Sequence, residues 1–267
     1  MKILYLYILA PLLVINVVQL QGQHSETISV VLSDPDDEGT LLLYNHNGTI
    51  TVEGQNRSDV EVVIKSKKES RKKASKRAGL KIIPKSAMGV SILEEDNEIH
   101  ISTSNNDMRD FLIRVPLNFS LQLSTHHNGR IYVSNVVGEH EIESHHGDIE
   151  LQEVGGSVIA DTHHGEIEVS MTRVYTDAPM AFTTYHGDVD VSFPTSTNAI
   201  LKLKSGKGDI YTDFDLEIVD QDIEKSSKNG IKKIKLGGWT KGKIGSGGPE
   251  LLMDTYHGDV IIRKTKN

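Results

Sequence analysis

Residues 124–170 read STHHNGRIYVSNVVGEHEIESHHGDIELQEVGGSVIADTHHGEIEVS, and this stretch repeats one phrase three times. Each copy contains a glycine, Gly129, Gly147 or Gly165, that is followed two and four residues later by apolar residues. The step between these glycines is 147 − 129 = 18 and 165 − 147 = 18 residues. The phrase returns at Gly48, Gly187, Gly208 and Gly258. A fixed step with alternating apolar residues is typical of a β-solenoid.

The repeats therefore predict an all-β fold, a single elongated β-solenoid of stacked parallel rungs. Each rung would hold roughly 18–22 residues in two strands, and the terminal rungs would be irregular. Equivalent residues of successive rungs would stack at the strand spacing of a sheet, about 4.8 Å. This register predicts two inward-facing columns, Ile131–Ile149–Ile167–Val189 and Val133–Leu151–Val169–Val191.

Composition narrows the class of protein. The chain has 267 residues, of which 37% are hydrophobic and 25% charged, as in ordinary soluble proteins. Aromatic residues make up only 5%, which suits thin rungs better than a thick globular core. The net charge of −8 gives no general reason to expect nucleic-acid binding. The absence of cysteine excludes disulfide bonds and a lipid-modified N-terminal cysteine.

The first 22 residues resemble an export signal. One lysine precedes an apolar run from Ile3 to Leu20, which predicts a secretory signal peptide over residues 1–22, cleaved near Gly22 or Gln23. An uncleaved anchor is the alternative. We therefore expect an exported protein, in the periplasm or at the cell surface, that is not integral in the membrane after cleavage.

The remaining chain divides into three predicted parts. Residues 23–123 form an N-terminal β-rich part of the solenoid, with a basic insertion at 65–77. That insertion is either a solvated loop or a local contact for an anionic partner. Residues 124–215 form the regular rungs. Residues 216–267 form a Lys/Gly-rich excursion, with a hairpin turn at Asn229–Gly230, and then a closing rung from Pro249 to Arg263.

Histidines gather at the corner of the repeat. Counted back from each glycine, the adjacent position holds Asn47, Asn128, His146, His164, His186, Lys207 and His257. The position before it holds His46, His127, His145, His163, Tyr185, Gly206 and Tyr256. The position after the glycine holds mainly Asp or Glu. We expect these columns to lie along one edge of the solenoid.

Three interpretations of the histidines stay open. In the first, the residue before the glycine has left-handed backbone angles, which Asn and His tolerate better than most residues, so histidine at that corner needs no function. Alternatively, His145, His146, His163 and His164 bind Zn, Ni or Cu, with Asp148 or Glu166 as a further partner. Thirdly, stacked histidines beside acidic residues form an edge that responds to pH.

Catalysis is disfavoured. Some β-helix enzymes that act on polysaccharides use a mixed polar constellation, which Arg130, His146, Asp148 and Lys207 could form. Repetition of the same residues argues against distinct catalytic roles. The sequence also lacks Gly-x-Ser-x-Gly, His-Glu-x-x-His and a phosphate-binding loop. We therefore expect no enzyme activity, no catalytic residue and no cofactor other than the metal considered above.

Three stretches carry a family resemblance: GTLLLYNHNGTITV (39–52), FLIRVPLNFSLQLSTHHNGRIYV (111–133) and GSGGPELLMDTYHGDVIIRK (245–264). They resemble the bacterial β-strand-repeat family of unknown function, whose members are often labelled as candidate adhesins. The resemblance implies an exported, solenoid-like domain and no reaction. The family usually has Asn before the repeat glycine, and the chain departs from it at His146, His164, His186 and His257.

The predicted function is that of an exported cell-envelope module for binding, adhesion-like contact or scaffolding, without catalysis. A repeated edge suits a repetitive partner, either a glycan polymer or another envelope protein, through many weak contacts. The candidate contact residues are Asp148, Glu166, His186, Asp188, His257 and Asp259. The alternatives are a metal-binding or pH-responsive envelope protein and, less favoured, an enzyme that acts on polysaccharides.

Overall fold

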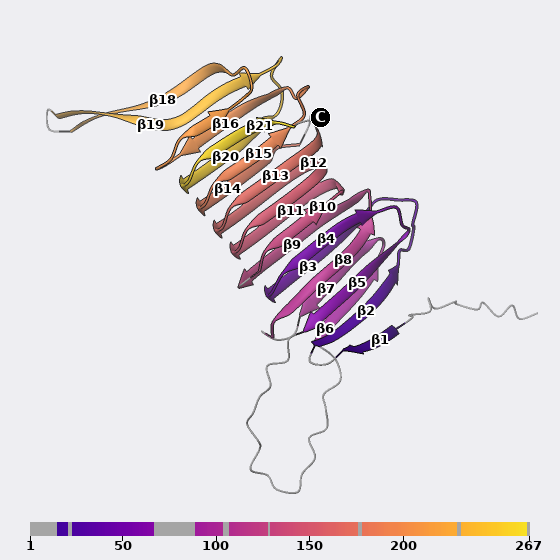
Figure 1. The fold of residues 1–267 in the computed structure, drawn as a ribbon. Coiled ribbons are helices and arrows are strands. Elements are labelled where there is room, and N and C mark those ends of the chain that lie inside the picture. Colours follow the sequence, from indigo (N-terminus) through magenta and orange to yellow (C-terminus); the bar gives the residue numbers. More distant parts are fainter. Residues whose placement is uncertain are drawn as a thin grey trace, which may run out of the picture.

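The computed structural model describes residues 15–20, 23–66, 89–103, 107–127, 129–175, 178–228 and 231–265. This part of the chain is all-β and contains no helix, and its strands join one sheet (Figure 1). Accordingly, it offers no helix that is long and apolar enough to cross a membrane. The all-β prediction is confirmed.

Some predicted segments lie outside the described residues. The proposed signal peptide is described only at Ile15–Leu20, strand β1, which pairs antiparallel with β2 (Gln23–Val31). Most of the basic insertion at 65–77 and the turn at Asn229–Gly230 are not described. The division of the chain into signal peptide, N-terminal part, regular rungs and excursion stays a prediction.

Most strands belong to two parallel ladders, which Figure 1 shows as successive rungs. The first ladder runs through β8 (Arg109–Pro116), β4 (Ile50–Gln55), β10 (Ile131–Ser134), the first half of β12 (Ile149–His164), β13 (Ile167–Val174), β15 (Val189–Phe193), β21 (Val260–Lys264) and β17 (Ile210–Thr212).

The second ladder begins at the same end of the molecule. It runs through β7 (Glu98–Thr103), β3 (Gly39–Asn47), β9 (Phe119–His127), β11 (Val137–His146), the second half of β12, β14 (Met180–His186), β20 (Glu250–His257) and β16 (Ala199–Ser205). Strand β12 crosses from one ladder to the other through Glu153 and Gly156, both of which have positive φ.

The core lies between the ladders, and its register follows the repeat. Ile131 pairs with Ile149, Ile149 with Ile167, and Ile167 with Val189. These residues and the parallel column through Val133 and Leu151 are at most 1% exposed. Both predicted inward columns are therefore confirmed. Burial of such aliphatic side chains, each contributing about 1.5–3 kcal/mol, stabilises the stack.

The spatial order of the rungs differs from the order in the sequence. We expected the copy at Gly258 to close the stack after the copy at Gly208. Instead, Val189 pairs with Val260, and Val260 pairs with Ile210. The last copy is thus the second rung from the end, and its prediction as the closing rung was wrong. The outer edge of β16 is already covered by β19 (Ile231–Ile244), which pairs with it antiparallel.

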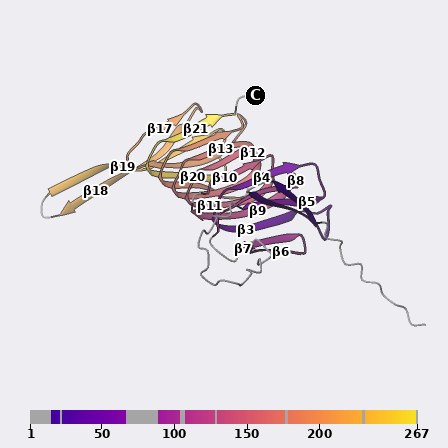
Figure 2. The ribbon, with the colours of Figure 1, turned by 60° about the horizontal axis from the view of Figure 1, so that its bottom comes forward.

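A similar insertion occurs at the other end. Strands β3 and β4 come early in the chain, yet they lie between β7–β8 and β9–β10. At each end of the stack, the outermost parallel rung is therefore not the one that comes first or last in the sequence. Strands β7 and β8 lie outside β3 and β4 at one end, and β16 and β17 lie outside β20 and β21 at the other. The excursion after residue 216 forms the predicted hairpin, β18 (Glu217–Lys228) with β19, which extends beyond the stack in Figures 1 and 2.

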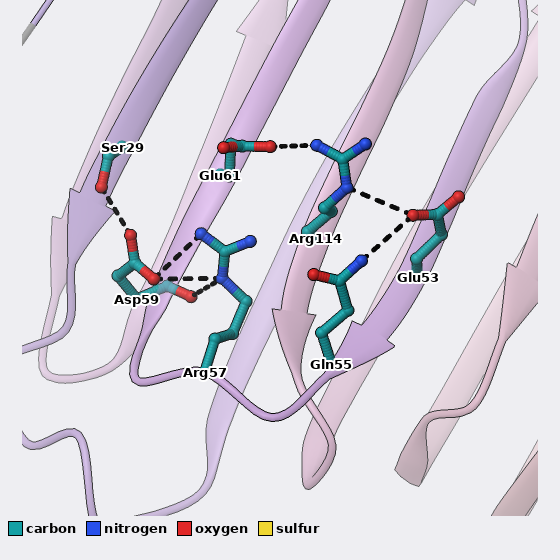
Figure 3. A network of polar contacts seen from close by, with 7 residues as sticks. All are labelled: Ser29, Glu53, Gln55, Arg57, Asp59, Glu61 and Arg114. Carbon is teal, nitrogen blue, oxygen red and sulfur yellow. Dashed lines mark hydrogen bonds and ion pairs between the residues drawn. The ribbon is translucent and has the colours of Figure 1, made fainter.

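Antiparallel strands cover the first end of the stack. Strand β5 (Asp59–Ser66) pairs with β8 and β2, and β6 (Val90–Glu95) pairs with β7 through a hairpin turn at Asp96–Asn97. A polar network joins this cap to the parallel ladder (Figure 3). In it, Arg114 on β8 contacts both Glu61 on β5 and Glu53 on β4.

A second group of polar contacts reaches β2. Arg57 forms an ion pair with Asp59, whose carboxylate also accepts a hydrogen bond from the hydroxyl of Ser29, at 2.6 Å (Figure 3). These contacts lie on the outer face and fix the cap strands side by side. They explain how an antiparallel cap is held on a parallel ladder, and they leave the corner edge free.

Candidate functional site

The repeated glycine allows successive rungs to approach at the corner. A Cβ atom on Gly147 would lie 2.0 Å from the carbonyl oxygen of Gly129, and one on Gly165 would lie 2.3 Å from that of Gly147. On Gly258 it would lie 2.0 Å from the oxygen of Gly187. Because backbone blocks the space in each case, the corner admits no side chain at this position.

A hydroxyl group just before the ring residues ties each corner to the neighbouring rung. The hydroxyl of Thr184 donates to the carbonyl of Gly165 at 3.0 Å, and that of Thr255 donates to the carbonyl of Gly187 at 2.8 Å. The full set of donors is Thr125, Ser144, Thr162, Thr184, Ser205 and Thr255. These bonds satisfy carbonyls that the corner leaves outside the strand ladders.

The acidic column after the glycine has a similar structural role. A carboxylate oxygen of Asp148 accepts the backbone N–H of Glu166 at 3.1 Å. Asp188 accepts that of Asp259, and Asp259 accepts that of Asp209, both at 2.8 Å. Three of the carboxylates predicted as contact residues therefore hold the next rung. Glu166 is exposed.

Next to these corners, aromatic rings form two stacked columns, which we call the ring edge. The first ring column contains His46, His126, His145, His163, Tyr185 and Tyr256. The second contains His127, His146, His164, His186 and His257. The prediction that the corner residues line up along one edge is confirmed by this stacking.

Within each column the rings lie face to face. In the first column, centroids are 4.6 Å apart for His126 and His145 and 5.0 Å apart for Tyr185 and Tyr256, with planes inclined by 12° and 5°. In the second column, His186 and His257 are 4.6 Å apart. Each inner ring therefore has both faces covered by its neighbours, so that its edge is the part left for contacts with other groups.

The structure corrects the alignment of one corner. We expected His127 in the first column and Asn128 in the second. Instead, His126 stacks on His145, and His127 stacks on His146. The corner is one residue longer than the others, because Thr125 precedes its glycine by four positions, whereas Ser144 precedes Gly147 by three. Thr125 and Ser144 stay paired in register, so the two residues after each of them align and the additional residue of the longer corner comes after the histidines.

The structure also excludes the explanation from backbone strain. The described residues with positive φ, glycine aside, are Asp96, Asn97, Asn135 and Glu153. None of the histidines before the repeat glycines is among them, and His146, His164, His186 and His257 end extended strands. Left-handed backbone therefore does not account for histidine at these corners, and that interpretation was wrong.

Crowding lowers the pKa of two histidines of the ring edge. Loss of solvent beside neighbouring rings, and then repulsion from His146 and His126, lower the pKa of His145. The same causes, with His163 as the first repelling neighbour, lower the pKa of His164. Lowered pKa values favour neutral imidazoles, whose nitrogens keep a free lone pair.

No preformed metal site of three or more His, Asp or Glu side chains occurs in the part of the chain that the structure describes. The four predicted ligands do lie together. The rings of His145 and His163 are 5.3 Å apart, those of His146 and His164 are 5.2 Å apart, and both pairs within a rung are 4.3 Å apart. The four rings are thus neighbours, whereas metal binding stays a prediction.

The hypothetical catalytic constellation is dispersed. Arg130 forms an ion pair with Glu150 at 3.0 Å, and Asp148 is bonded to the backbone of the next rung. Lys207 lies near the ring of Tyr256, 5.9 Å from its centroid, with three rungs between it and His146. These residues do not surround one reacting group.

His140 is a buried histidine that the repeat pattern did not indicate. It faces inward from β11, is 3% exposed, and pairs in register with Leu121 and Val158. Neither ring nitrogen makes a hydrogen bond of good geometry, although the backbone of Val136 and Gly155 lies close to the ring. Burial lowers the pKa of His140 to about 4, although the backbone of Val136 and Gly155 acts in the opposite direction. The side chain is therefore neutral in an otherwise aliphatic environment.

His140 predicts a loss of stability in acid. Between its ordinary pKa of 6.5 and about 4, the unfolded chain binds a proton that the folded chain does not bind. The contribution of neutral His140 to the free energy of unfolding is therefore complete above pH 6.5. It decreases, by up to about 3 kcal/mol, as the pH falls toward 4. His140→Val should reduce this dependence, as measured by urea unfolding at pH 7.5 and 5.0. His100→Ala, at an exposed position, is the control, and an unchanged pH dependence in His140→Val would contradict the assignment.

Comparison with known families identifies the chain. The family model described as Toastrack DUF4097 matches residues 120–263, which is more than half of the sequence. The chain belongs to this family. The match covers the regular rungs, the hairpin and the inserted last rung, and the sequence-based resemblance to a strand-repeat family of unknown function is confirmed. No curated protein matches the chain.

Several solved structures resemble this Toastrack protein over most of their length. A candidate cell adhesion protein from Clostridium sporogenes is 12% identical, with 91% of this chain and 100% of that chain covered and a TM-score of 0.46. A candidate adhesin from Bacteroides fragilis is 10% identical, with 92% and 98% covered and a TM-score of 0.41. A candidate lipid-binding protein from Parabacteroides distasonis is 11% identical, with 91% and 97% covered and a TM-score of 0.28. These values support no transfer of function.

Proposed function

We propose that this Toastrack protein is an exported, non-catalytic binding or scaffold module of the bacterial cell envelope, and that the ring edge is its contact surface. The two ladders act as one β-solenoid scaffold that sets the spacing of the rings. The observation that carries the proposal is the unbroken double column of rings across five successive rungs, from His126–His127 to Tyr256–His257. A repeated surface suits a repeated partner.

The orientation of the rings defines the partner's chemistry. Because the inner rings cover one another's faces, sugar rings cannot stack on them as they stack on an isolated aromatic side chain. Ring nitrogens and the hydroxyls of Tyr185 and Tyr256 are instead available as hydrogen-bond donors and acceptors. We therefore propose a glycan polymer whose polar groups recur at nearly the rung spacing, bound along the stack through many weak hydrogen bonds.

A length series tests this proposal. Oligomers of a neutral β-glucan and of an acidic polyuronate, from two to twelve sugars, are titrated against the full chain by calorimetry. The expected affinity rises with oligomer length until the oligomer spans the ring edge. Exchange of His145, His146, His163 and His164 for Asn should reduce the affinity about tenfold or more. Matched exchanges of two hydrogen-bonded residues of the first ladder that lie outside the ring columns, Tyr132→Ser and Gln152→Ser, should have little effect. Absence of binding, or equal losses in both variants, would refute the proposal.

A further inference from the structure

We infer that the three consecutive pairs His126–His127, His145–His146 and His163–His164 form a chelating surface for divalent zinc, nickel or copper. Imidazoles from one rung or from two adjacent rungs would be the ligands. This goes beyond the proposed contact with a glycan and does not depend on it, since the ion alone is the probe.

The nitrogens of one pair already approach each other. The Nδ1 atoms of His145 and His146 are 2.7 Å apart, and the Nδ1 atom of His146 is 3.3 Å from the carbonyl oxygen of His126. At most one of two nitrogens at this distance carries the hydrogen, so a lone pair points into the space between them. An ion bound by both nitrogens would take the place of the shared proton once the rings rotate to separate them.

A third nitrogen nearby lacks a partner. The Nδ1 atom of His126 is buried and has no hydrogen-bond partner. Its ring lies 4.6 Å from that of His145 and 6.3 Å from that of His146. A buried unpaired polar atom is destabilising unless a ligand or another group satisfies it. Stacking of the rings explains their spacing but not this unpaired nitrogen.

The rings can adjust to an ion at small cost. His127, His145, His146, His163 and His164 are exposed, so they can rotate without disturbing the core. Metal–nitrogen bonds are about 2.0–2.1 Å long, and adjacent strands are about 4.8 Å apart, so imidazoles of neighbouring rungs can reach one ion. Such rotation is required, because the described side chains do not form a ready three-ligand site.

The donor set selects the kind of ion. The chain has no cysteine, and the nearby carboxylate of Asp148 is engaged with the backbone of the next rung. Imidazole donors suit zinc, nickel and copper, whereas calcium and magnesium prefer oxygen ligands. Tyrosines replace the first histidine of the pair in the last rungs, at Tyr185 and Tyr256, so chelation should weaken toward that end.

The test titrates metal-free full-length chain with ZnCl2, NiCl2, CuCl2 and, as a negative control, MgCl2. Zinc, nickel and copper should bind and raise the melting temperature with increasing concentration, and magnesium should not. The variant His126→Asn/His145→Asn/His146→Asn should lose about tenfold or more in affinity. The control His186→Asn/His257→Asn removes histidines of the same edge that have tyrosine neighbours, and it should keep its affinity within about twofold.

A spectroscopic measurement covers the case in which the triple variant fails to fold. Electron paramagnetic resonance of Cu2+ bound to the unmodified chain should show coupling to two or more imidazole nitrogens. Absence of binding by the three ions, equal losses in both variants, or a copper signal with oxygen ligands alone would each overturn the inference.

Discussion

Gly165→Ala should destabilise the protein severely, by about 3 kcal/mol or more, because the new Cβ atom would lie 2.3 Å from the carbonyl oxygen of Gly147. That oxygen belongs to backbone at a corner where the rungs are in contact, so neither partner can move alone. Rungs on both sides would have to separate, and the inward columns at Ile149 and Ile167 would lose contact. Thermal unfolding should show a decrease in melting temperature of about 10 °C.

Gly155→Ala is the matched control. The three atoms nearest to its added Cβ atom would all be side-chain atoms, of Arg173, Thr172 and Val137, each at 3.1 Å. Its backbone does not have positive φ, so a small adjustment of these side chains accommodates the methyl group. We expect a change in melting temperature less than half that of Gly165→Ala. Similar values for the two variants would show that close approach of the corners does not determine the stability of the stack.

Deletion of residues 250–267 should detach the rung formed by β16 and β17, which comes earlier in the sequence, from the rest of the stack. Strands β20 and β21 lie between β14–β15 and β16–β17, and their residues Leu251, Met253, Val260 and Ile262 are completely buried. Loss of this rung removes the parallel partners of β16 and β17. Residues 199–244 should then become sensitive to protease, whereas residues 119–174 remain protected.

Limited proteolysis with mass spectrometry measures this effect. The control exchanges Leu252 and Ile261, partly exposed residues of the same rung, for Ser, and it should keep residues 199–244 protected. A stack in sequence order would lose only its last rung on deletion, so the rung at residues 199–212 would stay protected. That result would contradict the inserted position of β20 and β21.

Much of the architecture could be predicted from local spacing. The step of 18 residues between Gly147 and Gly165 determines the register of Ile149 and Ile167, because side chains alternate along each strand and stack between strands. The spacing contains no information on which distant strands become neighbours. The insertion of β20 between β14 and β16, like that of β3 between β7 and β9, therefore could not be derived from the order of the repeats.

The candidate site was predicted in composition but not in detail. Repetition indicated that His145, His146, His163 and His164 would gather, and they do. The shift of His127 to the second column could have been found from the longer interval between Thr125 and Gly129. His140 lies away from the repeated corner, where its neighbours in the sequence are glutamates, so only the structure shows its burial.

The residue columns at the corner of the repeat differ in their roles. Glycines, hydroxyls and aspartates connect one rung to the next, whereas the exposed imidazoles of the ring edge are available for binding. The most direct test is the melting temperature of the chain in which His145, His146, His163 and His164 are all exchanged for Asn. We predict a change of less than about 4 °C in metal-free buffer. A decrease of more than about 10 °C would show that the rings hold the fold together, and it would contradict their assignment as a binding surface.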